Sequence, residues 1–103
     1  MKVLFHLDET EKWSMTLANV KNFLHEVPDA HITVVANGPA VKYYTTDAIE
    51  ADLLAQVDFV ACNNALKANT IQPPQINTAV RIVNAGVVEI ARKQKEGYAY
   101  IRP

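Results

Sequence analysis

A chain of 103 residues is long enough for one domain with a single core, and we expect one domain over residues 1–103. Half of its residues are hydrophobic and a fifth are charged, which is the mix of an ordinary globular protein. The formal net charge is −1, so no broad positive field favours nucleic acid or an anionic membrane as a partner.

The chain has a single cysteine, Cys62, which excludes an internal disulfide. That count favours a reducing compartment or a reactive thiol. The N-terminus has one lysine and three consecutive apolar residues, Val3 to Phe5, before a histidine. This run is too short for a signal peptide or a membrane span, and we therefore expect a cytoplasmic protein.

Two strands and a helix are predicted in the first part of the chain. Residues 2–7 form a mostly apolar run of strand length, typical of a parallel strand buried on both faces. Asp8 with Glu11 resembles a capping box, and apolar residues then recur every three or four positions up to Val27, which predicts an amphipathic helix. The β-branched residues of the segment 31–36 predict the second strand.

The rest of the chain continues the alternation of strands and helices. Residues 40–46 fit either a short helical turn or a loop, whereas Asp47 with Glu50 again resembles a helix start. The proline-rich segment 72–75 is a predicted loop. Further strands are predicted at 58–61, 79–83 and 98–102, and further helices at 47–57, 63–69 and 87–96. Such alternation implies parallel βαβ units, so we predict a three-layer α/β/α sandwich around one five-stranded, mostly parallel sheet.

In open α/β sheets, ligands bind beyond the carboxyl ends of the strands. The residues that follow the predicted strands are therefore the candidate site residues. They are His6, Asp8, Asn37, Gly38, Cys62, Asn63, Asn64, Asn84 and Gly86. Strand-to-helix turns also select Asn, Asp and Gly for local reasons, so the list is equally typical of ordinary turns.

Cys62 lies at the switch from the third strand to a helix, and two interpretations of it stay open. The unpaired N–H groups and the positive dipole end of a helix lower the pKa of a thiol and favour the nucleophilic thiolate. Alternatively, Cys62 is a small core residue, since free cysteine is among the most buried residue types.

Several chemistries have no support in the sequence. It contains no G-x-G-x-x-G or P-loop motif for nucleotides, no G-x-S-x-G elbow and no C-x-x-C pair. One cysteine and three dispersed histidines give no zinc-binding spacing. We therefore expect neither a cofactor nor a metal.

Four segments together resemble the DsrE/DsrF-like family, in particular its small stand-alone branch. They are FHLDE at 5–9, VVANGPAV at 34–41, ACNNALKANTI at 61–71 and NAGVVEIARKQKEGYAYIRP at 84–103. The resemblance implies the strand order 4-3-2-1-5 and assembly into homotrimers or hexamers. In characterised relatives, a cysteine at the position matched by Cys62 carries sulfur as a persulfide, usually together with partner subunits.

The resemblance favours a sulfur-handling protein, either a sulfurtransferase or a sulfur carrier. Cys62 would take sulfur from a donor and pass it to an acceptor thiol. Asn63 and Asn64 would stabilise the anionic sulfur, Gly38 and Asn84 would flank it, and His6 would donate a proton. The alternative is a non-catalytic oligomeric module that binds a small ligand or a protein and in which Cys62 only packs.

Overall fold

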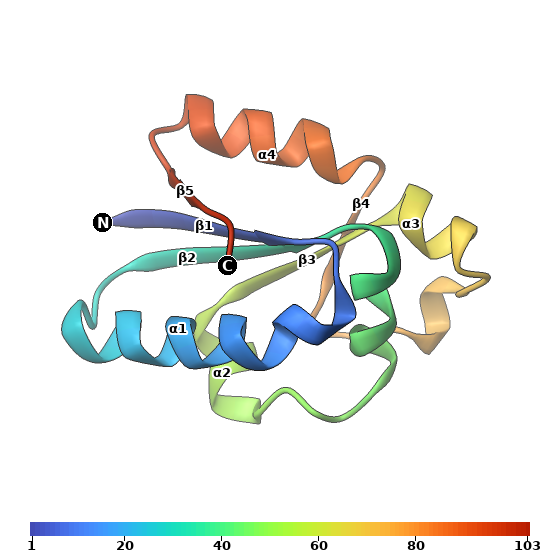
Figure 1. The fold of residues 1–103 in the computed structure, drawn as a ribbon, viewed down its shortest axis with the longest axis horizontal. Helices are drawn as coiled ribbons and strands as arrows, with labels where there is room; N and C mark the ends of the chain where they lie inside the picture. Colours follow the sequence, from blue (N-terminus) through green and yellow to red (C-terminus); the bar gives the residue numbers. More distant parts are fainter.

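A five-stranded sheet separates two helical layers in the computed structural model, which describes residues 1–103 (Figure 1). The sheet order is 4-3-2-1-5 and every strand pair is parallel. The strands are β1 (Lys2–Leu7), β2 (His31–Ala36), β3 (Asp58–Cys62), β4 (Arg81–Val83) and β5 (Ala99–Ile101). The predicted architecture and order are confirmed, and the sheet is wholly rather than mostly parallel.

The helices cover the two faces of this sheet unequally. Helices α1 (Trp13–Glu26) and α2 (Ala51–Gln56) lie on one face, α4 (Gly86–Lys95) lies on the other, and α3 (Asn63–Ala68) follows the carboxyl end of β3 (Figure 1). Three 3-10 segments complete the chain: η1 (Thr10–Lys12), η2 (Gly38–Thr45) and η3 (Pro73–Gln75). None of the helices combines the length and the apolar character needed to cross a bilayer.

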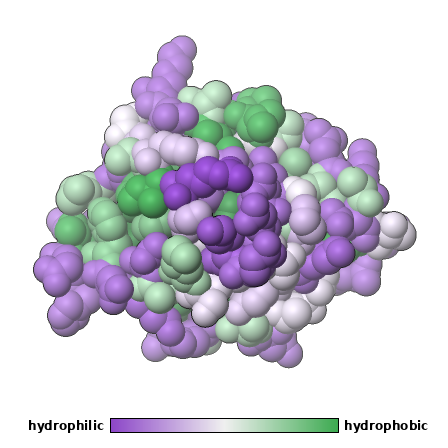
Figure 2. All heavy atoms as spheres, viewed as in Figure 1, coloured by the Kyte–Doolittle hydropathy of each residue, from purple (hydrophilic) through white to green (hydrophobic).

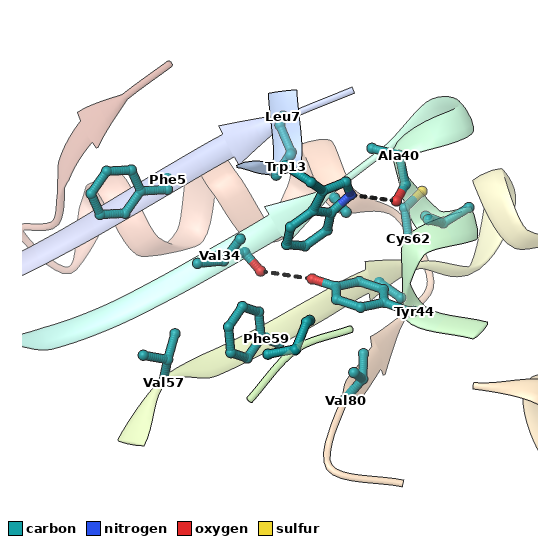
Figure 3. Packing of buried hydrophobic residues seen from close by; sticks show 14 of the residues in the cluster. Phe5, Leu7, Trp13, Val34, Ala40, Tyr44, Val57, Phe59, Cys62 and Val80 are labelled. Atoms are coloured by element: carbon teal, nitrogen blue, oxygen red, sulfur yellow. Dashed lines mark hydrogen bonds between the residues drawn. The ribbon is translucent and has the colours of Figure 1, made fainter. Parts of the chain in front are cut away.

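The main core lies between the sheet and the layer that contains α1, α2 and η2. It contains 21 buried residues, with Trp13 among the largest. The Trp13 indole Nε1–H donates to the carbonyl of Ala40 at 2.8 Å (Figure 3). The Trp13 ring also stacks on Tyr43, with 4.7 Å between the ring centroids. The Tyr44 hydroxyl donates to the Val60 carbonyl at 3.0 Å, and burial raises the pKa of Tyr44 well above its ordinary value. The two tyrosines of the ambiguous segment are therefore packing residues in a helical turn.

The second core, beneath α4, is much smaller and partly ionic. Its apolar centre is Leu4, Val35 and Val60. Beside it, the Arg81 guanidinium donates to Asp58 at 2.8 and 3.1 Å and also binds the buried carboxylate of Glu89. These contacts, the Asp58 hydrogen bond foremost, raise the pKa of Arg81 above its ordinary value. Charged pairs thus take the place that apolar side chains occupy on the opposite face.

Neither predicted capping box is present. The first helical segment begins at Thr10 as η1 and becomes α-helical at Trp13; its N-cap residue is Glu9, and the Asp8 carboxylate binds Arg102 instead of capping it. The helix expected from Asp47 begins at Ala51, with Glu50 as its N-cap residue and no capping side chain. Neither Asp8 with Glu11 nor Asp47 with Glu50 forms a capping box.

Other boundaries move by a few residues. β4 begins at Arg81 rather than at residue 79, because Val80 N–H closes a turn onto the Asn77 carbonyl. β5 spans residues 99–101 rather than 98–102, and the proline-rich loop contains η3. Gly97, with φ of +93°, follows the end of α4 in the left-handed conformation that is common for a glycine after a helix.

Candidate functional site

The structure places every predicted site residue at the carboxyl edge of the sheet, where parallel strands end together. They do not form one pocket there. The edge divides into the surroundings of Cys62, a close contact between the segment after β2 and α4, and a polar cavity beyond β1 and β5.

Cys62 is the last residue of β3 and the N-cap residue of α3. Its relative exposure is 7%, and its side chain belongs to the main core close to Ala40 (Figure 3). The thiol lines none of the five cavities of the molecule. No side chain caps α3, so the N–H groups of its first turn have no side-chain partner beside the sulfur. The thiol has the predicted place in the fold but little access to solvent.

The asparagines expected around the thiol diverge from it. Asn64 is exposed to solvent, and Asn63 lines a depression of about 300 Å³ together with Lys67 and Thr70. Asn84 lines a separate cavity of about 300 Å³ beside Glu89 and Arg92. The three amide side chains therefore do not surround the sulfur as a single shell.

Asn37 and Gly86 lie against each other. A Cβ on Gly86 would lie 2.3 Å from Asn37 Oδ1, so only glycine fits beneath that amide. Asn37 Oδ1 is buried and has no hydrogen-bond partner. The neighbouring Gly38 has φ of +50°, and its Cβ position is 3.3 Å from the carbonyl oxygen of Asp8. Contact with the Asn37 amide accounts for Gly86, and the positive φ together with the nearby Asp8 carbonyl accounts for Gly38.

His6 lies at the end of β1 and faces the last strand. The distance between His6 Nδ1 and the Tyr100 hydroxyl oxygen is 2.6 Å, whereas His6 Nε2 is buried without a partner. Burial lowers the pKa of His6 below 6.5, and the charge of Arg102 lowers it further, while Asp8 acts in the opposite direction. The imidazole is therefore neutral at pH 7.

A polar cavity of about 190 Å³ opens beside His6. Asp8 and Arg102 form an ion pair across it, with 2.9 Å between Asp8 Oδ1 and Arg102 Nη2. Glu9 and Lys12, from the start of η1 and its last residue, complete the charged lining. Figure 2 shows hydrophilic side chains gathered near the middle of the face, over the ends of β1 and β5.

His6 and Asp8 are thus the two predicted residues that share a cavity, and the sequence reasoning missed its other charged members. A usable signal for Arg102 was present. The implied strand order places β5 beside β1, and the observed register pairs Ile101 with Phe5. The residue after Ile101 consequently lies beside the end of β1, next to His6. Glu9 and Lys12 carry no comparable signal, because no pattern in the sequence relates them to the end of β5.

Comparison with solved structures shows a full-length relative. The protein MTH1491 from Methanobacterium thermoautotrophicum, described as a protein of unknown function, has a TM-score of 0.90 and 32% sequence identity. The alignment covers 99% of this chain and 98% of that one. The chain belongs to the MTH1491 family. No protein-family model matches the sequence, and no curated protein does.

A more distant structure extends the fold beyond the MTH1491 family. BT1422 from Bacteroides thetaiotaomicron, also a protein of unknown function, has a TM-score of 0.68 and 12% identity, over 99% of this chain and 94% of that one. At this identity the likeness concerns the fold alone. Both neighbours share the architecture of this chain, and neither has a described function.

Proposed function

We propose that the protein handles sulfur and that Cys62 is the residue that carries it. The observation behind the proposal is the position of the single thiol. Cys62 ends an interior strand of a parallel sheet at the uncapped start of α3, where backbone N–H groups favour negative charge on sulfur. The resemblance to the DsrE/DsrF-like family supports the same position.

The proposed reaction is an exchange without net oxidation. The Cys62 thiolate attacks the outer sulfur of a donor persulfide, the donor S–S bond breaks, and the donor leaves as a thiolate. Cys62 then holds the sulfur as a persulfide. An acceptor thiolate attacks that outer sulfur, takes it as its own persulfide and releases the Cys62 thiolate.

The surroundings of Cys62 assign roles to few neighbours. The N–H groups of the first turn of α3 are the nearest candidates to stabilise the anionic sulfur, whereas the Asn63 side chain lines the depression beside Lys67. His6 lies two strands away in the order of the sheet, so we do not assign it proton donation to this sulfur. Because the thiol is 7% exposed, a donor has to displace part of η2 or α3 to reach it.

The family resemblance completes the proposal with partners. We propose a homotrimer or hexamer that works in the cytoplasm with a sulfur donor protein and an acceptor protein. A lone thiol without a disulfide partner fits that reducing compartment.

Intact mass spectrometry after incubation with a sulfane-sulfur donor tests the proposal. We expect the wild type to gain one sulfur atom that dithiothreitol removes, and Cys62→Ser to gain none. A wild-type protein whose mass does not change, under conditions that load a free thiol control peptide, would overturn the proposal. Thermal unfolding of Cys62→Ser verifies that the variant is folded.

A second candidate function follows from a different observation. Cys62 lines no cavity, whereas His6, Asp8 and Arg102 share one at the same edge. This arrangement supports a small-ligand binding module in which Cys62 only packs. An alkylation rate for Cys62 that rises only when the protein is unfolded, together with a wild-type mass unchanged by the sulfur donor, would favour this second candidate.

A further inference from the structure

The cavity beside His6 lies where the course of the chain reverses across the sheet. From β1 the chain proceeds to β2, β3 and β4 on one side, and it then returns through α4 to place β5 on the other side of β1. In open α/β sheets, ligands bind beyond the carboxyl ends of the strands, at the place where the strand order reverses. In this molecule that place is the crevice between β1 and β5, and the cavity of about 190 Å³ occupies it.

The crevice is lined by two carboxylates and two cations, but only one carboxylate and one cation form an ion pair. Asp8 and Arg102 neutralise each other at 2.9 Å. Glu9 and Lys12 also line the cavity, and neither forms an ion pair with any residue. The crevice therefore presents one carboxylate and one ammonium group whose charges are available to a ligand.

Side-chain hydrogen bonds fix the wall of the crevice that β1 and β5 form. Its His6 imidazole is held by the Tyr100 hydroxyl at 2.6 Å and adds no charge at pH 7. The Arg102 guanidinium has five N–H donors and donates one hydrogen bond to Asp8, so other N–H groups can bind the carboxylate of a ligand. The cavity of about 190 Å³ is large enough for a ligand of a few non-hydrogen atoms.

We propose that the crevice between β1 and β5 binds a small zwitterion, with the carboxylate and ammonium groups of a simple α-amino acid. Its carboxylate lies between Lys12 and the free edge of Arg102, and its ammonium group faces Glu9. A simple anion would satisfy Lys12 and leave Glu9 unpaired, whereas a simple cation would do the reverse. The site is separate from Cys62, so it neither requires sulfur transfer nor depends on its failure.

Titration of the ¹⁵N-labelled protein, followed through its amide signals, tests the proposal with four probes. Glycine and L-alanine carry both charges, while acetate and methylammonium carry one each. We expect saturable shifts for residues around 8–12 and 102 with the two zwitterions, at an affinity about tenfold or more above that of either single-charge probe. Acetate binding as tightly as glycine would overturn the zwitterion assignment, and no saturable shift with glycine or L-alanine would overturn the site.

Variants that keep the fold locate the binding. Glu9 is exposed and Lys12 is partly exposed, so Glu9→Gln and Lys12→Gln remove a charge without opening the core. We expect each to weaken glycine binding about tenfold. Lys42 is an exposed cation on η2 that does not line the cavity, and Lys42→Gln should leave glycine binding unchanged. Equal affinities for all variants would overturn the assignment. Cys62→Ser should bind glycine like the wild type, which separates this test from the test of sulfur transfer.

Discussion

The two faces of the sheet are stabilised by different physics. On the face of α1 and α2, 21 buried residues pack around Trp13 and the aromatic side chains beside it. On the face of α4, the apolar cluster has three buried residues, and Arg81 joins Asp58 to the buried Glu89. One face relies on apolar area removed from water, and the other relies on charges that satisfy each other.

The comparison shows why substitutions on the two faces should differ in kind. An apolar core loses free energy in proportion to the atoms removed and the cavity left behind. A buried charge pair adds little when complete, but removal of one partner leaves the other desolvated and unpaired. The following predictions test that difference, in order of decreasing effect.

The largest effect is expected for Trp13→Ala. The substitution empties the centre of the main core and removes the Nε1 hydrogen bond to Ala40, so we expect a loss of about 4 kcal/mol in the free energy of unfolding. Urea denaturation measures it. Met15→Ala, an exposed position on the same helix, is the control and should change stability by less than about 0.5 kcal/mol. A small loss for Trp13→Ala would mean that the apolar face does not dominate stability.

Glu89→Gln tests the ionic face. The side chain is 2% exposed and accepts hydrogen bonds from Arg81 and Arg92, so the neutral amide should cost about 2 kcal/mol of stability. Chemical denaturation of this variant is compared with that of the exposed control Glu96→Gln. In the double variant with Arg81→Ala the two costs should not add, because both residues belong to one network. Strict additivity would show that the charges act independently.

Tyr44→Phe removes one polar contact from the apolar face without opening a cavity. The lost hydroxyl bond to the Val60 carbonyl should cost about 1 kcal/mol, less than the loss of charge at Glu89. Thermal and urea unfolding of the two variants under the same conditions provide the comparison. A cost above that of Glu89→Gln would contradict the expectation that losing a buried charge destabilises the protein more than losing one neutral hydrogen bond.

The smallest expected effect is the change in stability with pH that the titration of His6 causes. Its pKa is lowered in the folded state, so the unfolded chain binds more protons below pH 6.5. The contribution of His6 to stability is therefore complete above pH 6.5 and is lost as the pH falls through the folded pKa. NMR titration of the imidazole should give a midpoint below 6.5, and His6→Gln should flatten this part of the stability profile. A midpoint above 6.5 would contradict the burial of the ring.

The sequence predicted the fold more fully than the site. Strands β1 and β2 can be predicted from the sequence because a buried parallel strand requires a run of apolar or β-branched residues of strand length. The strand order came from the resemblance, not from periodicity. The predicted capping role of Asp8 is wrong, because its carboxylate binds Arg102, which is distant in the sequence. The site shows the same limit of local sequence patterns. His6 and Asp8 could be predicted because they lie at the end of β1, whereas Glu9 and Lys12 line the cavity only through tertiary contacts.

The short final strand places the crevice at one edge of the sheet. β5 pairs with β1 over three residues, and it carries Tyr100 and leads directly into Arg102. A strand held by so few ladder bonds exchanges its amide protons through local opening, well before the whole protein unfolds. We therefore expect hydrogen–deuterium exchange of residues 99–101 to be faster than that of β2. A bound ligand that bridges Arg102 and Lys12 would slow that exchange by fastening the chain end to the start of α1.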